Sequence, residues 1–307
     1  MQLYLPIAEM SVDPFVLLVL GGGIGFLSGL FGVGGGFLLT PLLIFIGVPP
    51  AVAVATQANQ VIAASASGAL SHWRRGNVDI RMGLVLLVGG FVGSSLGVWI
   101  YTALRAIGQL DLVIALAYVF FLGLIGSLML LESARVIIRK MGSAPPPRRK
   151  LHIHTWLHGL PFKTRFRTSK LYISALVPFT IGVGVGVLSV ILGTGGGFLL
   201  LPAMIYLLGV PTMIAVGTSL FQTVFVAANI TFLQAAHNHT VDIVLALMLI
   251  VGGVIGAPLG SRFTGRLPGE QLRALLALIV FGVSVKLLID LVRTPADLYL
   301  VLSGGIS

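Results

Sequence analysis

Two long stretches of the chain contain no Asp, Glu, Lys or Arg: residues 14–73 and residues 171–241. Each far exceeds the roughly 20 apolar residues that cross a bilayer once. The chain must therefore fold back through the membrane within each stretch, which predicts an all-α, polytopic integral membrane protein. Overall composition agrees, because only 9% of the 307 residues are charged, whereas an ordinary soluble domain has about a quarter.

Apolar segments predict two sets of five helices that cross the membrane fully or halfway. The first set falls near residues 14–31, 36–46, 51–73, 82–104 and 110–134, and the second near residues 171–192, 197–208, 213–236, 243–261 and 271–292. The second helix of each set is short. It is left open whether 14–46 and 171–208 form full spans or half-membrane hairpins.

A polar segment, residues 142–170, separates the two sets and contains three successive prolines, so it predicts a linker. Basic residues beside a membrane normally face the cytoplasm and anionic lipid, which explains the net charge of +10 better than nucleic-acid binding does. The expected organisation is a first transmembrane repeat at 1–141, a basic cytoplasmic linker at 142–170 and a second transmembrane repeat at 171–307.

The two sets of helices repeat one sequence pattern. Gly32-Val-Gly-Gly-Gly-Phe-Leu-Leu-Thr-Pro41 matches Gly193-Thr-Gly-Gly-Gly-Phe-Leu-Leu-Leu-Pro202. Three more matches follow in the same order: Gly47-Val-Pro with Gly209-Val-Pro, Ala53-Val-Ala-Thr56 with Ala215-Val-Gly-Thr218, and Val78-Asp-Ile80 with Val241-Asp-Ile243. The chain is therefore interpreted as a tandem repeat of about five helices per half.

Equivalent loops of the two repeats differ in charge. The loop at residues 74–81 contains three arginines, whereas its counterpart at 237–242 has no Lys or Arg. The next pair reverses, since the turn at Arg105 is weakly basic and its counterpart at 262–273 contains three arginines. Under the positive-inside rule, equivalent loops then lie on opposite sides, as in inverted repeats. Both termini are expected outside and the linker inside.

Each repeat contains three successive glycines, which let the backbone bend and let a ligand approach closely. These glycines are Gly34, Gly35 and Gly36 in the first repeat, and Gly195, Gly196 and Gly197 in the second. A short helix that begins at each triplet would present its N-terminus, about half a positive charge, to an anion. Glycines in the series of Gly21, Gly89 and Gly252 suit close helix contact instead.

Uncharged polar side chains follow the triplets within otherwise apolar helices. They are expected to line a substrate path beside the glycines, although hydrogen bonding between helices is an equally good interpretation of any single one. The polar candidates are Thr56, Gln57, Asn59, Gln60, Thr218, Ser219 and Gln222. Because acidic residues fall only near the ends of the expected helices and cysteine is absent, no catalytic residue, metal site or cofactor is expected.

The duplicated order of Gly-rich segment, Pro, Gly-Val-Pro, Ala-Val-x-Thr and Val-Asp resembles the TauE/SafE sulfite exporter family over nearly the whole chain outside the linker. The resemblance implies a carrier in the bacterial or archaeal cytoplasmic membrane for small sulfur-containing anions such as sulfite, sulfoacetate or other organosulfonates, often in the export direction. Alternating access around the paired glycines is the expected mechanism.

Several alternatives remain open. Another small organic anion could be the substrate, and a homodimer could be the assembly. A non-transporting membrane component or an intramembrane enzyme is a different class of explanation, but no acid, metal or recognised catalytic pattern favours an enzyme.

Overall fold

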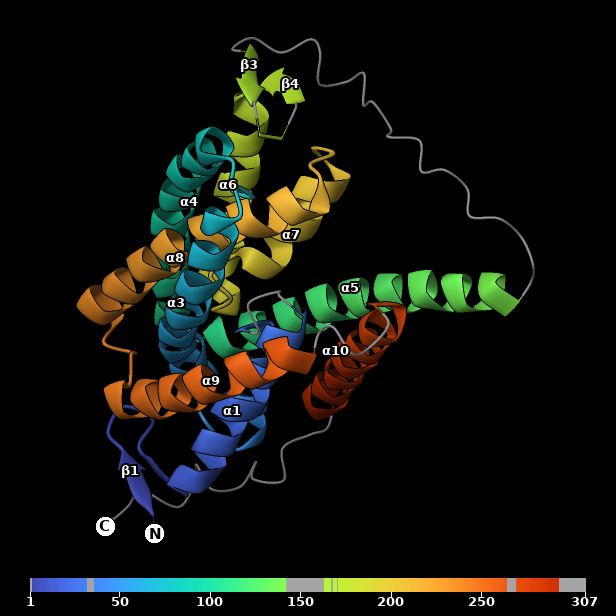
Figure 1. Ribbon diagram of the computed structural model, residues 1–307. Coiled ribbons are helices and arrows are strands. Elements are labelled where there is room, and N and C mark those ends of the chain that lie inside the picture. The colour runs from blue at the N-terminus through green and yellow to red at the C-terminus, as the bar shows by residue number, and fades with distance from the viewer. Residues whose placement is uncertain are drawn as a thin grey trace, which may run out of the picture.

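The computed structural model describes residues 2–31, 36–141, 163–166, 168–169, 171–263 and 269–292. These residues form two sets of five α-helices (Figure 1). The first half consists of α1 (Pro14–Phe31), α2 (Gly36–Phe45), α3 (Pro50–Arg74), α4 (Ile80–Ala106) and α5 (Leu110–Met141). The second half consists of α6 (Leu176–Leu192), α7 (Gly197–Tyr206), α8 (Thr212–Leu233), α9 (Ile243–Phe263) and α10 (Gly269–Val292). A π-helical turn, η2 (Gln234–Asn238), extends α8.

The helices differ in how far they could reach through a bilayer. Within the described residues, α4, α5, α8 with η2, α9 and α10 are long and apolar enough to cross a membrane. Helices α2 and α7 have 10 residues each, or about 15 Å at 1.5 Å per residue, half of the roughly 30 Å hydrocarbon core. The second helix of 14–46 and of 171–208 is therefore of half length.

Two short antiparallel hairpins add strands to the fold that the sequence predicted as all-α. β1 (Leu3–Leu5) pairs with β2 (Met10–Val12), and β3 (Lys163–Phe166) pairs with β4 (Leu171–Ser174). The helix expected near 171–192 consequently begins at Leu176. In β1 and β2 the middle residue is exposed and the last is buried, as in a half-buried strand. Residues 163–166 belong to the range expected as linker, whereas 142–162 lie outside the described residues.

Each hairpin directly precedes the first helix of its half, and the two hairpins lie at opposite ends of the molecule (Figure 1). The halves are interlocked. Helix α1 packs along α9 of the other half, and α6 packs along α4 in the same way. The remaining large contacts join equivalent helices, α3 with α8 and α5 with α10. Neither half therefore buries its helices without the other.

Glycines bring the interlocked helices into backbone contact. A Cβ atom built on Gly25 would lie 2.6 Å from the carbonyl oxygen of Gly253, and one built on Gly186 would lie 2.7 Å from that of Gly90. Such separations are too short for any side chain, so α1 and α9, and likewise α6 and α4, pack backbone to backbone. The close-contact interpretation of the Gly21, Gly89 and Gly252 series is confirmed.

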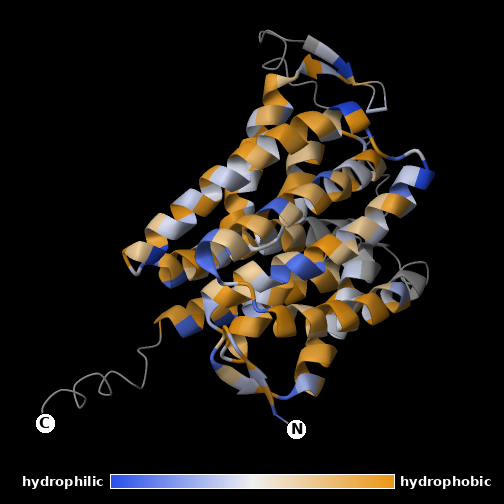
Figure 2. Cartoon of the chain, turned by 90° about the vertical axis from the view of Figure 1, so that its left-hand side faces the viewer, coloured by the Kyte–Doolittle hydropathy of each residue, from blue (hydrophilic) through white to orange (hydrophobic). Residues whose placement is uncertain are grey.

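Many large hydrophobic residues of the helices are exposed, and hydrophobic residues predominate along the helices (Figure 2). Trp99, Phe120 and Phe232 are 72%, 61% and 69% exposed. A contiguous apolar exterior is unfavourable in water but suits contact with lipid chains. The polar residues of α3 are buried, including Thr56, Gln57 and Gln60. The protein is thus apolar outside and locally polar inside.

Candidate functional site

The second glycine segment is a buried turn between two helices. Helix α6 ends at Leu192, and α7 begins at Gly197 with Gly196 as its N-cap. Gly193, Gly195 and Gly196 have φ values of 63°, 63° and 89°, which only glycine adopts without strain. The Leu200 N–H donates to the Gly196 carbonyl at 2.8 Å, whereas the N–H groups of the first helical residues have no acceptor within a helix. The turn therefore presents a helix N-terminus inside the protein.

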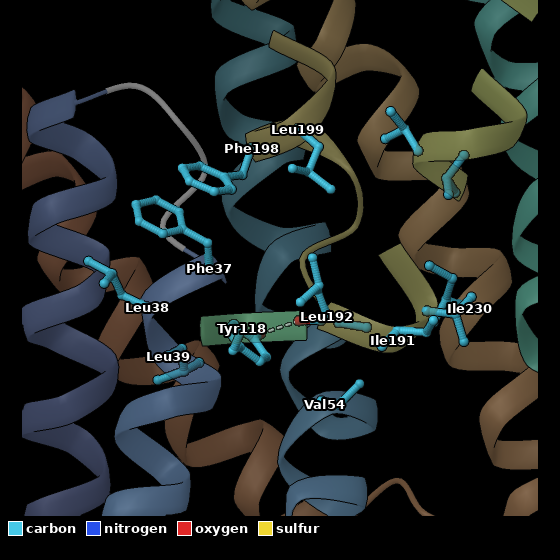
Figure 3. Close-up of a cluster of buried hydrophobic side chains, with 14 of the residues drawn as sticks. Phe37, Leu38, Leu39, Val54, Tyr118, Ile191, Leu192, Phe198, Leu199 and Ile230 are labelled. Carbon is cyan, nitrogen blue, oxygen red and sulfur yellow. Dashed lines mark hydrogen bonds between the residues drawn. The ribbon is translucent and has the colours of Figure 1, made fainter. Parts of the chain in front are cut away.

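Gly36, the last residue of the first glycine segment, lies beside the second segment. Gly34 and Gly35 lie outside the described residues, but Gly36 starts α2. A Cβ built on Gly36 would lie 3.2 Å from Gln57 Nε2 and 3.8 Å from Thr194 Cα. Immediately after the glycines, the rings of Phe37 and Phe198 stack with centroids 4.1 Å apart (Figure 3). The N-termini of the two half-length helices therefore face each other across an aromatic pair.

Three buried polar side chains lie around the second turn and make no hydrogen bond to the described residues of the protein. Gln222 and Thr223 on α8 are 0% and 1% exposed, and Thr194 in the turn is 4% exposed. Among the described residues, the side-chain oxygen and nitrogen atoms of these three have no hydrogen-bond partner. Leaving a buried polar group unpaired costs about 1–3 kcal/mol. Such groups are unusual in a native structure and point to a role outside folding.

Both polar atoms of the Gln57 side-chain amide are hydrogen-bonded. Its Oε1 accepts from the Thr40 hydroxyl, and its Nε2 donates to the Gly193 carbonyl at 2.9 Å. The Tyr118 hydroxyl donates to the neighbouring Leu192 carbonyl (Figure 3). Gln57 and Tyr118 thus bind the two carbonyls at the end of α6 and position the glycine turn from the first half.

The two threonines that the sequence analysis placed beside the substrate path join the two halves by hydrogen bonds. Thr56 Oγ1 accepts from the Asp242 N–H, and Thr218 Oγ1 accepts from the Asp79 N–H, both at 3.0 Å. All four residues are buried. The Asn59 amide and the Ser219 hydroxyl bond to carbonyls of their own helices, and Gln60 Nε2 donates to the Gly21 carbonyl on α1 at 3.4 Å.

The two aspartates also hold the β hairpins. The Asp79 carboxylate caps α4 through the Met82 N–H and accepts from the backbone N–H and hydroxyl of Ser169, in the β3–β4 turn, at 2.9 and 2.8 Å. The Asp242 carboxylate accepts from the first backbone N–H groups of α9 and from Ile7, in the β1–β2 turn, at 2.9 Å. We call these the Asp79 contact (Asp79, Ser169, Thr218) and the Asp242 contact (Asp242, Ile7, Thr56).

The structure thus divides the residues that the sequence analysis grouped. Gly36, Gln57, Gly195, Gly196, Gly197 and Gln222 lie together at the central turn. Sequence reasoning missed Thr194 and Thr223, although each directly adjoins a residue that it named, and it missed Tyr118, a hydroxyl in an apolar helix. No group of three metal-binding side chains occurs within the described part of the chain.

Comparison with known proteins agrees with this architecture. The family model described as "Sulfite exporter TauE/SafE" matches residues 17–287. A "Probable membrane transporter protein" of Xylella fastidiosa (strain 9a5c) is 31% identical, with 90% of this chain and 95% of that protein covered. The "Probable membrane transporter protein YjnA" of Bacillus subtilis (strain 168) is 30% identical, with 91% and 100% covered. No solved structure matches the chain.

An apolar exterior, half-length helices and a buried polar centre, together with these relatives, define a multi-pass membrane transporter and not an enzyme. The alignments cover nearly the full length of both relatives. The chain belongs to the TauE/SafE sulfite exporter family.

Proposed function

We propose that the protein exports small sulfur-containing anions, such as sulfite, sulfoacetate or other organosulfonates, across the bacterial or archaeal cytoplasmic membrane. The observation that carries this proposal is the buried central turn, where a helix N-terminus and unpaired polar side chains converge. A helix N-terminus attracts an anion without a buried cation, which would be costly in a bilayer. The name of the matching family supports the sulfur-containing substrate.

Proteoliposome assays test the substrate. We expect purified full-length protein to move labelled sulfite or sulfoacetate into vesicles, with empty vesicles as the control. Acetate serves as a comparison of similar size. Equal movement of all three would favour the alternative of a general organic anion carrier, and movement of none would contradict the proposal. Varying the pH gradient and the membrane potential separately identifies what drives transport.

The two aspartate contacts provide a structural basis for alternating access. They occupy equivalent positions in the two halves, and the hairpins that they hold lie at opposite ends of the molecule (Figure 1). In inverted repeats, equivalent contacts face opposite sides of the membrane. We infer that the two contacts open alternately, the Asp79 contact on the cytoplasmic side and the Asp242 contact on the outside. The central glycine turn is then accessible from one compartment at a time.

Labelling tests this orientation, and the absence of cysteine from the chain makes single introduced cysteines unambiguous. Arg75 and His237 are exposed and end equivalent helices of the two halves. In right-side-out vesicles, we expect an impermeant thiol reagent to modify His237→Cys readily and Arg75→Cys only after the membrane is opened with detergent. Modification of both variants from the same side would contradict inverted repeats.

A further inference from the structure

We propose that the two halves bind different parts of the substrate: the oxyanion group binds only at the second glycine turn, with the hydroxyls of Thr194 and Thr223 and the amide of Gln222 as donors. The substrate class is then a compact R–SO3 anion, including sulfite, with its apolar side toward the first half. This inference rests on the proposed transport of sulfur-containing anions.

The three donors adjoin the N-terminus of α7. A Cβ built on Gly197 would have Thr223 Oγ1 as its nearest neighbour at 3.1 Å, and one built on Gly196 would lie 3.9 Å from Gln222 Oε1. Thr194 belongs to the turn itself, between Gly193 and Gly195. The Gln222 amide has Oε1 toward Gly196 and Nε2 toward Gly90, and rotation of the amide exchanges these two atoms. The two threonines and this amide therefore place unpaired polar groups beside the first N–H groups of α7.

These polar groups are available to bind a substrate because they make no hydrogen bonds to the described residues of the protein. Across the described ranges of the chain, Thr194 Oγ1, Thr223 Oγ1 and both amide atoms of Gln222 lack a hydrogen-bond partner while being fully shielded. A buried unpaired donor weakens the fold, and a bound oxyanion would supply the missing acceptor. The unpaired groups are thus an observation independent of the helix N-terminus.

The equivalent positions of the first half cannot supply such donors. Aligning the repeats places Val33 opposite Thr194 and Val61 opposite Thr223. Val61 presents its methyl groups to both glycine segments, with Cγ1 2.8 Å from a Cβ built on Gly195. Gln60 is opposite Gln222, and its Nε2 donates to the Gly21 carbonyl at 3.4 Å. Gln57 already bonds to Thr40 and Gly193. Among the described residues, the first half therefore presents the methyl groups of Val61 where the second half presents the Thr223 hydroxyl.

This polarity selects the class of anion. Several donors on one side match the three oxygens of a pyramidal –SO3 group better than the two oxygens of a planar carboxylate. The apolar surface at Val61 accepts a lone pair or a methylene group. No Lys or Arg occurs between residues 171 and 241, so neutral donors and the helix N-terminus carry the recognition.

Valine substitutions test the inference, because the first half has valine at both equivalent positions, Val33 and Val61. In purified full-length protein, we expect Thr194→Val and Thr223→Val each to weaken equilibrium binding of sulfite and sulfoacetate about tenfold or more, as loss of a hydrogen bond to a charged group predicts. Thr194→Ser and Thr223→Ser, which keep the hydroxyl, should bind like the wild type. Thr180→Val is the matched control, since Thr180 is exposed and its hydroxyl donates to the Val177 carbonyl of its own helix.

Thermal stability without ligand separates recognition from folding. Exchanging an unpaired buried hydroxyl for a methyl group should leave stability unchanged or raise it, so binding falls in a protein that is at least as stable. Wild-type binding by both valine variants, with transport by the wild type intact, would overturn the inference. Wild-type protein that neither binds nor transports these anions would instead contradict the proposed function.

Discussion

Gly196→Ala is expected to abolish substrate flux while the protein still inserts into the membrane. Gly196 has a φ of 89°, where a Cβ costs roughly 1–2 kcal/mol. The added Cβ would also lie 2.7 Å from Ser189 Oγ and 2.9 Å from Val185 Cγ1. Both atoms belong to α6, so the turn must open and move the N-terminus of α7 away from the donors around it. Flux per inserted protein, measured in proteoliposomes, checks this expectation.

Two further alanine variants distinguish backbone strain from steric contact as the cause of the lost flux. Gly209 has a φ of 72° with no atom within 4 Å of a built Cβ, so Gly209→Ala introduces backbone strain without contact and should lower thermal stability but keep flux. Gly184 lies in α6 with open space around it, and Gly184→Ala should be neutral or slightly stabilising. Wild-type flux in the Gly196→Ala variant would contradict the placement of the central turn on the transport path.

Gly25→Leu and Gly186→Leu are expected to prevent assembly of the folded protein. The two glycines are equivalent in the two halves, and a Cβ on either would lie within 2.6–2.7 Å of a backbone carbonyl on the facing helix. The atoms in contact belong to helix backbones, so the helices must separate. Overpacking of this kind costs about 1–3 kcal/mol even where side chains can adjust, and backbones adjust less. Loss of the monodisperse peak in detergent, with membrane insertion retained, is the expected measurement.

The matched controls lie two residues away. Gly23 and Gly184 are also equivalent to each other and have no atom within 4 Å of a built Cβ. Gly23→Leu and Gly184→Leu place the same side chain on the exposed face of the same helices, where leucine suits lipid. They should yield folded protein. If all four leucine variants behaved alike, interlocking through α1–α9 and α6–α4 would not limit assembly.

Local patterns were sufficient to predict the helices and the duplication. Apolar segments placed most helices within a few residues of their observed bounds, because insertion in a membrane depends on the summed hydropathy of one segment. Small residues spaced along α1, α4 and α9 indicated close helix contact, since a helix face is a property of neighbouring turns. The hairpins were missed because strands of 3 or 4 residues carry too little pattern to distinguish from a helix end.

The site was predicted less completely. Thr56 and Thr218 looked like a substrate lining because a polar residue in an apolar helix needs a partner, and the sequence does not name that partner. The partners are Asp242 and Asp79, which are 186 and 139 residues away in the chain. Conversely, Gln57 and Gln222 looked similar in sequence, yet one is bonded on both sides and, within the described residues, the other has no partner.

By itself, the sequence determined that this protein is a helical membrane transporter with glycine triplets at equivalent positions of two repeats, since hydropathy and repetition are properties of the linear sequence. Only the tertiary structure decided which polar groups the fold uses and which remain unpaired beside the turn at Gly195–Gly197. The physical reason is that a hydrogen bond satisfies a group only through atoms brought together in space. Interlocking of the halves supplies those atoms from distant segments.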